Sequence, residues 1–113
     1  MPYIAINTAQ ELSLEQKEKI KTELGRLITL IPTKTEAGLM VDFSGNRGLY
    51  RGGQEVPGAF IEVRLYTKAE TEPKKQLTKA IFDLLAGELG FKKEQIYLNI
   101  LELENWGTNG ELI

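Results

Sequence analysis

The chain matches itself without gaps when it is shifted by 57 residues, so that position 3 falls on position 60. Tyr3-Ile4-Ala5-Ile6 then lies over Phe60-Ile61-Glu62-Val63. Two further sets of apolar positions coincide: 20, 24, 27 and 28 with 77, 81, 84 and 85, and 39, 41 and 43 with 96, 98 and 100. Few identities are shared between the halves, but the pattern of apolar side chains is the same. A chain with this repeat is expected to build one substructure twice.

Each half has the pattern of a strand, a helix and a second strand. In the second half, Ile61, Val63 and Leu65 alternate with charged residues, which is the two-residue period of a half-buried strand. The helical segments carry apolar residues at i, i+4, i+7 and i+8, and such a one-sided stripe must pack against another element. Both helices are therefore expected to lie on the same layer of strands.

The starts of both helices can be read from the sequence. Ser13 and Gln16 have the spacing of a capping box, which marks the beginning of the first helix. The second helix is expected to begin at Thr71-Glu72-Pro73, because proline is tolerated in a first turn. A strand on each side of a helix implies a right-handed β-α-β crossover. The predicted fold is therefore α+β, with a pseudo-twofold, four-stranded mixed sheet and two helices on one face.

We expect one domain over residues 1–113, with halves at residues 1–44 and 58–101 and a C-terminal hairpin at residues 102–113. Asn109-Gly110 is a strong hairpin signal within that last segment. The glycine-rich segment 45–53 between the halves lacks the Gly-Lys-Ser/Thr ending of a phosphate-binding loop. It is predicted to form turns and a hairpin, in which Leu49-Tyr50-Arg51 is compatible with a short edge strand.

The second face of the predicted sheet has no helix to cover it. It carries apolar and charged residues together, and a mixed face of this size is rarely left bare in water. Burial against other copies of the chain, with cyclic symmetry, is the expected solution. The alternation of the strands assigns these residues to this face: Tyr3, Ala5, Phe60, Glu62, Arg64 and Tyr66.

The composition argues against several classes of function. The chain has no cysteine and no histidine, so no disulfide can form and a transition-metal site is not expected. Its net charge of −2 argues against general nucleic-acid binding. No stretch approaches the roughly 18 consecutive apolar residues of a membrane span, and no signal-peptide pattern is found. We therefore expect a cytoplasmic protein that does not bind membranes.

Pro2 directly follows the initiator methionine. Aminopeptidases remove Met1 when the next side chain is small, so the mature chain is expected to begin with a free secondary amine at Pro2. In a chain without histidine, a general base must be a carboxylate, a lysine, a tyrosine or the terminal amine. Pro2 is therefore a candidate base.

Pro2, the doubled β-α-β unit, Tyr97-Leu98-Asn99 and Asn105-Trp106-Gly107 together resemble the tautomerase superfamily. The resemblance covers essentially the whole chain and is strongest to the macrophage migration inhibitory factor branch, in particular to its bacterial phenylpyruvate-tautomerase-like members. It implies a tautomerase fold that assembles as a homotrimer, in which three sheets surround a central channel. It also implies active sites between subunits.

The resemblance implies a cofactor-independent isomerase that interconverts the keto and enol forms of 2-keto acids such as phenylpyruvate. Pro2 corresponds to the proline whose nitrogen acts as general base and then acid. Lys34 corresponds to the lysine that holds the substrate carboxylate, and Tyr66 to a position that contacts substrate through its backbone N–H. Tyr97 and Asn99 correspond to pocket residues donated by a neighbouring subunit.

Other roles for these residues are also consistent with the sequence. Lys34 could be a solvated loop lysine, and Tyr97 could be a core residue with Asn99 satisfying a sheet edge. Trp106, the one tryptophan, is either a local core plug or an anchor against a neighbouring subunit, and as a pocket residue it would reshape the pocket mouth. Arg64 is expected to form a structural ion pair with Glu62, with carboxylate binding as the alternative.

Two alternative functions follow from the same resemblance. The first is a non-catalytic trimeric binding or signalling protein, as in the animal cytokine of this family. The cytokine's Cys-x-x-Cys segment is replaced here by Gly58-Ala59-Phe60-Ile61, so a thiol–disulfide activity does not carry over. The second is dehalogenation or decarboxylation of a small unsaturated acid. Asp42 or Glu62 could supply its carboxylate, but no arginine pair accompanies them.

Overall fold

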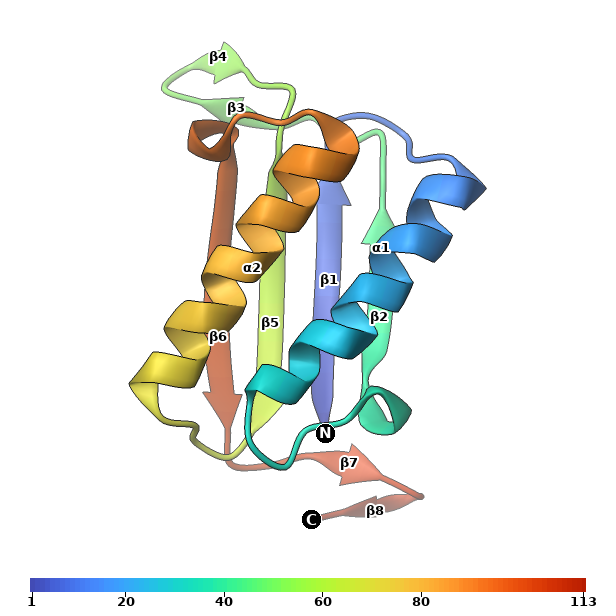
Figure 1. Ribbon diagram of the computed structural model, residues 1–113, viewed down its shortest axis with the longest axis vertical. Coiled ribbons are helices and arrows are strands. Elements are labelled where there is room, and N and C mark those ends of the chain that lie inside the picture. The colour runs from blue at the N-terminus through green and yellow to red at the C-terminus, as the bar shows by residue number, and fades with distance from the viewer.

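The computed structural model describes residues 1–113, which form one layer of β-sheet and one layer of helices (Figure 1). The strands of the main sheet have the order β2-β1-β5-β6. Pairing is parallel between β1 and β2 and between β5 and β6, and antiparallel between β1 and β5. The mixed, pseudo-twofold sheet predicted from the repeat is confirmed. Its strands are β1 (Pro2–Thr8), β2 (Met40–Ser44), β5 (Ala59–Tyr66) and β6 (Ile96–Leu103).

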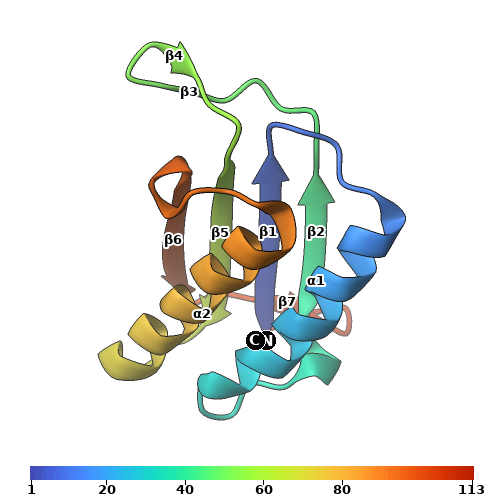
Figure 2. The ribbon, with the colours of Figure 1, turned by 45° about the horizontal axis from the view of Figure 1, so that its top comes forward.

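Both long helices cover the same face of the sheet, as Figures 1 and 2 show. The Ser13 hydroxyl accepts from the Gln16 N–H at 3.1 Å, and the Gln16 side chain accepts from the Ser13 N–H at 2.8 Å. The predicted capping box therefore begins the first helix. The helices are α1 (Leu14–Leu27) and α2 (Thr71–Leu89), with short 3-10 turns at η1 (Ile28–Leu30), η2 (Glu36–Gly38) and η3 (Lys93–Gln95).

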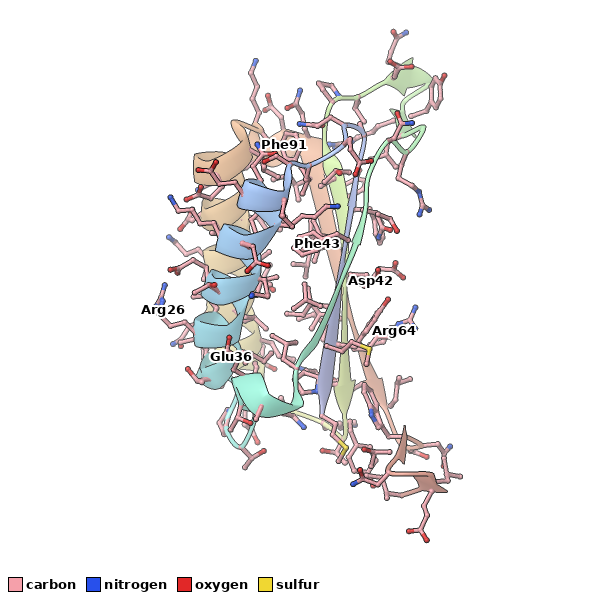
Figure 3. The ribbon with its side chains drawn as sticks, turned by 90° about the vertical axis from the view of Figure 1, so that its right-hand side faces the viewer. Arg26, Glu36, Asp42, Phe43, Arg64 and Phe91 are labelled. Carbon is pink, nitrogen blue, oxygen red and sulfur yellow. The ribbon has the colours of Figure 1, made fainter.

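The hydrophobic core lies between the helices and the sheet. Its side chains come largely from the matching positions of the two halves and form one continuous cluster. Phe91, which follows α2, closes one end of this layer (Figure 3). The fully buried members include Ile4, Ile6, Ile20, Leu24, Ile61, Val63, Leu77 and Ile81.

Two small hairpins stand outside the main sheet and extend the repeat further than the apolar pattern indicates. They are β3 (Tyr50–Arg51) with β4 (Gln54–Glu55), and β7 (Gly107–Thr108) with β8 (Glu111–Leu112). Each bound of the second hairpin is 57 residues beyond the first. Both turns use two residues with positive φ, Gly52-Gly53 at 60° and 78° and Asn109-Gly110 at 52° and 81°. Within the segment predicted as a C-terminal hairpin, the structure has a hairpin at residues 107–112, while residues 102 and 103 belong to β6. Residues 49–51 do not form an edge strand of the main sheet.

The face of the sheet opposite to the helices is open. Figure 3 shows Asp42 and Arg64 extending from it, away from α1 and α2. Large apolar side chains are exposed there as well, with Met40 at 67%, Tyr97 at 52% and Leu101 at 43% exposure. Both outer strands, β2 and β6, also have one unpaired edge. No helix combines the length and the apolar character needed to cross a membrane.

Candidate active site

Pro2 is buried at the start of β1, where it is paired with Leu65 of β5. The strand places it at the edge of a cavity of about 560 Å³. The cavity lies at the end of the sheet that is covered by the β7–β8 hairpin (Figure 1). Its walls come from four segments of the chain, and they include Met1, Tyr3, Gly38, Met40, Arg64 and Trp106.

Met1 occupies the position directly in front of the Pro2 nitrogen. Its carbonyl oxygen accepts a hydrogen bond from the Tyr66 N–H at 3.2 Å. The Lys34 ammonium donates to the Tyr66 carbonyl at 3.0 Å and lies beside the terminal amine of Met1. Burial first, and then the charge and hydrogen bonding of Lys34, lower the pKa of that amine below its ordinary value of 8.0. Lys34 is therefore directed at the chain terminus and is not a freely solvated loop lysine.

Strained backbone flanks both of these contacts. Thr33 and Thr67 have φ angles of 73° and 69°, a region that β-branched residues rarely adopt. Thr33 precedes Lys34 and Thr67 follows Tyr66, so both strained residues adjoin the contacts made at the chain terminus. Such strain is found mainly where the surrounding structure enforces it, often at functional sites. Neither threonine is suggested by the sequence, because nothing in the local pattern predicts positive φ there.

Trp106 lines the Pro2 cavity between the end of β6 and the β7–β8 hairpin. Its carbonyl accepts from the Ile113 N–H at 2.8 Å, which extends the pairing of β7 and β8 by one residue pair. Its ring lies 6.4 Å from that of Tyr66, tilted by 55°. The tryptophan thus forms an aromatic wall of the cavity and has the Tyr66 ring beside it, a position that agrees with the reshaped pocket mouth and not with a core plug.

Tyr97 and Asn99 do not reach the Pro2 cavity within one chain. Tyr97 is level with Phe60 of β5, whereas Pro2 is level with Leu65, five residues further along that strand. Five residues of a strand span about 16 Å. Tyr97 and Asn99 are exposed on the open face, so the interpretation of Tyr97 as a core residue is wrong.

The Tyr97 ring is held from two sides. It packs edge-on against Phe60, with 6.5 Å between ring centroids, and the Arg51 guanidinium lies 4.5 Å above it. Arg51 also donates to the Glu94 carbonyl, which ties the β3–β4 hairpin to this end of the sheet. The position and exposure of Tyr97 suit a residue that contacts a second chain.

Arg64 is a cavity residue that the predicted site left out. Its guanidinium forms the expected ion pair with Glu62, although at 3.3 Å, and lies 5.2 Å above the ring of Tyr3. Its Nε is buried without a hydrogen-bond partner. Buried donors without partners are few in folded proteins and call for an explanation. The sequence indicated only that Arg64 lies on the open face, with carboxylate binding as the alternative to its ion pair.

A second hollow of about 550 Å³ lies on the outer surface along α2 and β6. Four lysines line it, and each is paired with a carboxylate, so the hollow has little free charge to attract an anion. Apart from these lysines, its polar side chains are the hydroxyls of Thr71 and Thr78, and Thr78 donates to the Lys74 carbonyl. No group of three or more acidic side chains is arranged to hold a metal ion. The Pro2 cavity is therefore the better candidate for a catalytic centre.

The surroundings of residue 2 can support one kind of chemistry. A terminal amine whose pKa is lowered can accept a proton near neutral pH, and an ammonium next to it can hold an anionic group. The Tyr66 N–H, now bonded to the Met1 carbonyl, is a ready donor to an oxygen at that place. Together these groups suit proton transfer within a small oxygen-rich anion.

Comparisons with known proteins agree with this geometry. The family model described as macrophage migration inhibitory factor (MIF) matches residues 1–112. The fold is similar to that of MIF2 from Leishmania major, with 21% sequence identity, a TM-score of 0.92, and coverage of 100% of this chain and 97% of that chain. No curated protein sequence matches the chain significantly.

Two other solved structures share the fold at lower identity. Pt0534, crystallised after inactivation by 2-oxo-3-pentynoate, is 19% identical, with a TM-score of 0.85 and coverage of 96% and 93% of the two chains. The R7 fused 4-OT, solved as an asymmetric trimer, is 16% identical, with a TM-score of 0.83 and coverage of 96% and 94%. At these identities the likeness establishes a common fold and not a common activity.

Proposed function

Since the chain belongs to the macrophage migration inhibitory factor family, we propose that it is a cofactor-independent tautomerase of 2-keto acids with Pro2 as its base. Removal of Met1 turns the Pro2 nitrogen from an amide, which is not basic, into a secondary amine. The same removal vacates the space that Met1 fills between Lys34 and Tyr66. The observation that carries the proposal is this position of Met1, whose carbonyl accepts from the Tyr66 N–H.

The proposed reaction moves one proton. The Pro2 nitrogen takes a proton from C3 of the 2-keto acid, and the electrons of that C–H bond form the C2=C3 double bond. The C2 oxygen gains the charge and then receives the proton back from Pro2, which gives the enol. Lys34 holds the substrate carboxylate, and the Tyr66 N–H donates to a substrate oxygen. The reverse sequence converts enol to keto acid with the same groups.

Two features keep the Pro2 nitrogen uncharged in this proposal. Burial and Lys34 already lower the pKa of the amine at this end of the chain, with burial the larger cause. The processed amine begins one residue further into the fold, where Pro2 itself is buried. An amine in this setting loses its proton at lower pH than an exposed one, so more of it is available as a base near neutrality.

The proposed active form is a homotrimer. Tyr97 lies about 16 Å and Asn99 about 10 Å along the sheet from the level of Pro2 in their own chain, and both are exposed on the open face. A neighbouring chain could therefore supply them to the cavity and cover the exposed Met40 and Leu101 at the same time. The trimer recorded for the R7 fused 4-OT, and the 2-oxo acid that inactivates Pt0534, support this assembly and this substrate class.

The proposal is tested by comparing two forms of the same protein. Purified chain that begins at Pro2, verified by mass spectrometry, is expected to accelerate loss of phenylpyruvate enol. Chain that retains Met1 is expected to be inactive, because its Pro2 nitrogen is acylated. Pro2→Gly, which leaves a primary amine, is expected to lower kcat/KM by about 10²–10⁴-fold. Pro57→Gly, a change to an exposed internal proline, serves as the matched control.

Equal rates for the two forms would remove Pro2 as the base. If neither form accelerates the reaction while both sediment as trimers, the non-catalytic binding protein becomes the better description. Turnover of 3-haloacrylates without any effect on phenylpyruvate would instead favour dehalogenation.

A further inference from the structure

We propose that Arg64 binds a second carboxylate in the Pro2 cavity, so that the preferred substrates are 2-keto acids with two carboxylates. The inference rests on the function proposed above, in which Lys34 and Pro2 act on the 2-keto acid end of the same molecule. It adds to that function a position for the distal end of the substrate.

Arg64 lies on one side of Pro2 and Lys34 on the other. In the sheet, Arg64 is paired with Tyr3, the residue after Pro2, and it lines the same cavity. Its side chain extends from the open face of the sheet (Figure 3). Lys34 instead approaches the Tyr66 carbonyl, two residues further along β5. The backbone levels of Arg64 and Tyr66 are about 7 Å apart. In the proposed pose, one carboxylate of a small diacid therefore reaches Arg64 in the cavity and the other reaches Lys34, which lines the adjoining hollow with Thr33 and Thr67.

The guanidinium of Arg64 is not saturated within the chain. Its side chain is 42% exposed, and its only carboxylate partner is Glu62, through one 3.3 Å contact. Glu62 also accepts from the Asn7 side-chain amide at 3.1 Å, so it is shared between two donors. Asp42, the other acid on this face, accepts from the Tyr3 hydroxyl at 2.7 Å. Arginine holds a carboxylate best through two parallel hydrogen bonds, and neither acid provides them.

The remaining walls suit the carbon chain between two carboxylates. Met40, Leu103 and Trp106 supply apolar surface on the same cavity. Its volume of about 560 Å³ lies within the range of small-molecule sites, where a few polar groups fix orientation among apolar walls. The Tyr3 ring beneath the guanidinium holds Arg64 at the cavity wall. The arrangement thus distinguishes a diacid from a monoacid of equal length.

A matched pair of substrates tests the assignment. 2-Oxoadipate and 2-oxohexanoate have the same number of carbons and differ in the second carboxylate. For the chain that begins at Pro2, affinity is measured by calorimetry, and exchange of the C3 hydrogens for deuterium by NMR. We expect a preference of about 10- to 100-fold for the diacid in both measurements, because charged hydrogen bonds are strong.

Three variants locate the source of that preference. Arg64→Gln is expected to abolish most of it, whereas Arg26→Gln, an exposed arginine on α1, is expected to retain it. Glu62→Gln is expected to increase the preference severalfold, because it removes the carboxylate that competes for Arg64 while still accepting from Asn7. Arg64→Lys should keep part of the preference, since a cation remains. Circular dichroism and thermal unfolding verify that each variant is folded.

The outcomes separate this proposal from the proposed function. Equal affinity for the two acids, or a preference that survives in Arg64→Gln, would overturn the role of Arg64. Equal effects of Arg64→Gln and Glu62→Gln would also overturn it, because both break the same internal ion pair. If the diacid binds preferentially through Arg64 but neither acid exchanges, the second carboxylate site stands and the tautomerase activity is wrong.

Discussion

The two ends of the main sheet are built alike but enclose different spaces. At one end, the β7–β8 hairpin covers the start of β1 and a cavity of about 560 Å³ (Figure 1). At the other, the β3–β4 hairpin covers the start of β5 and a hollow of about 80 Å³. The shift of 57 residues relates their linings, since Pro2 and Met40 of the large cavity correspond to Ala59 and Tyr97 of the small one.

The difference arises from the chain terminus. At the end covered by the β3–β4 hairpin, the backbone continues through Gly58. This backbone lies so near the Gln95 carbonyl oxygen that a Cβ on residue 58 would collide with it. At the end covered by the β7–β8 hairpin, the residue related to Gly58 is Met1, and the residue related to Gln95 is Gly38. The candidate site therefore needs no new element of structure. A chain terminus and one small residue at a repeated position distinguish the larger cavity from the smaller one.

The turns after the two helices differ in the same way. Thr33 and Gly90 are related by the shift, and both have a φ of 73°. Glycine adopts this conformation without strain and ends α2, with its N–H bonded to the Ala86 carbonyl. In the first half threonine is strained there, and the next residue is Lys34 where the second half has buried Phe91. One turn thus serves packing and its counterpart serves the site.

The largest expected effect is a difference in stability between variants of Phe91 and of the related residue Lys34. Phe91→Ala removes a buried ring and should lower the free energy of unfolding by about 3–5 kcal/mol. Lys34→Ala at the related position should change it by less than about 1 kcal/mol, because one hydrogen bond to a carbonyl contributes little net stability. Urea denaturation of both variants measures the difference. Similar losses would show that the two turns do not divide their roles as described.

The next effect separates the counterparts by activity. Lys34→Met should lower kcat/KM for a 2-keto acid by about 10- to 100-fold, through loss of a charged hydrogen bond to the carboxylate. It should also raise the pKa of the terminal amine, because Lys34 no longer disfavours the protonated form. Since the neutral amine is the base, the rise of activity with pH should move to higher pH. If the pH dependence of activity does not change in Lys34→Met, Lys34 is not a cause of the lowered pKa of the terminal amine.

A smaller effect should follow from exchanging the turn residues. Gly90→Thr forces a β-branched residue into the left-handed region and should cost about 1–2 kcal/mol. Thr33→Gly relieves that strain but adds freedom to the unfolded chain, so its net change should stay within about 1 kcal/mol. Chemical denaturation measures both values. If Thr33→Gly also lowers kcat/KM, the strain at Thr33 contributes to the position of Lys34.

The smallest expected effect on stability concerns the C-terminal end of β6, which is related by the repeat to the C-terminal end of β2. Glu102 accepts from the Ala69 N–H at 2.6 Å and pairs with Lys74 at 3.0 Å, whereas the related residue is Gly45. These contacts, the backbone bond first, lower the pKa of Glu102 below its ordinary value of 4.5. Glu102→Gln should destabilise the fold by about 0.5–1.5 kcal/mol at neutral pH.

The sign of the pH dependence follows from the lowered pKa. The carboxylate of Glu102 contributes its stability fully above the unfolded pKa and loses it as the pH falls through the lower folded value. Unfolding of the wild type and of Glu102→Gln should therefore converge below about pH 4.5. A difference between them that persists at acidic pH would point to packing and not to charge.

Much of the architecture could be predicted because it depends on local patterns. The stripe of Ile20 and Leu24, the Ser13 capping box and the alternation around Val63 each follow from neighbours in the sequence. The second hairpin pair could not be read as part of the repeat, since Gly52-Gly53 and Asn109-Gly110 share a backbone conformation but little sequence. The two hairpin turns therefore repeat the backbone conformation but not the pattern of apolar side chains.

The site was less predictable because it depends on contacts between distant segments. Pro2, Lys34 and Tyr66 were named on a resemblance, and the fold brings these three together. Tyr97 lies near the end of β6 that is distant from Pro2, and Asn99 lies near the middle of that strand, so their role remains a proposal about a second chain. The incomplete hydrogen bonding of Arg64 depends on side-chain packing, which a single sequence pattern does not encode.

Each hairpin follows one half of the chain but covers the end of the sheet where the other half begins, and this bears on whether either half can fold alone. Leu49 and Arg51 follow the first half but close the end where the second half begins, and Trp106 does the converse for the first half. Neither half can seal its own end. We therefore expect that two fragments, divided in the exposed stretch between Gly52 and Glu55, do not fold when expressed separately. They should fold when they are mixed and associate.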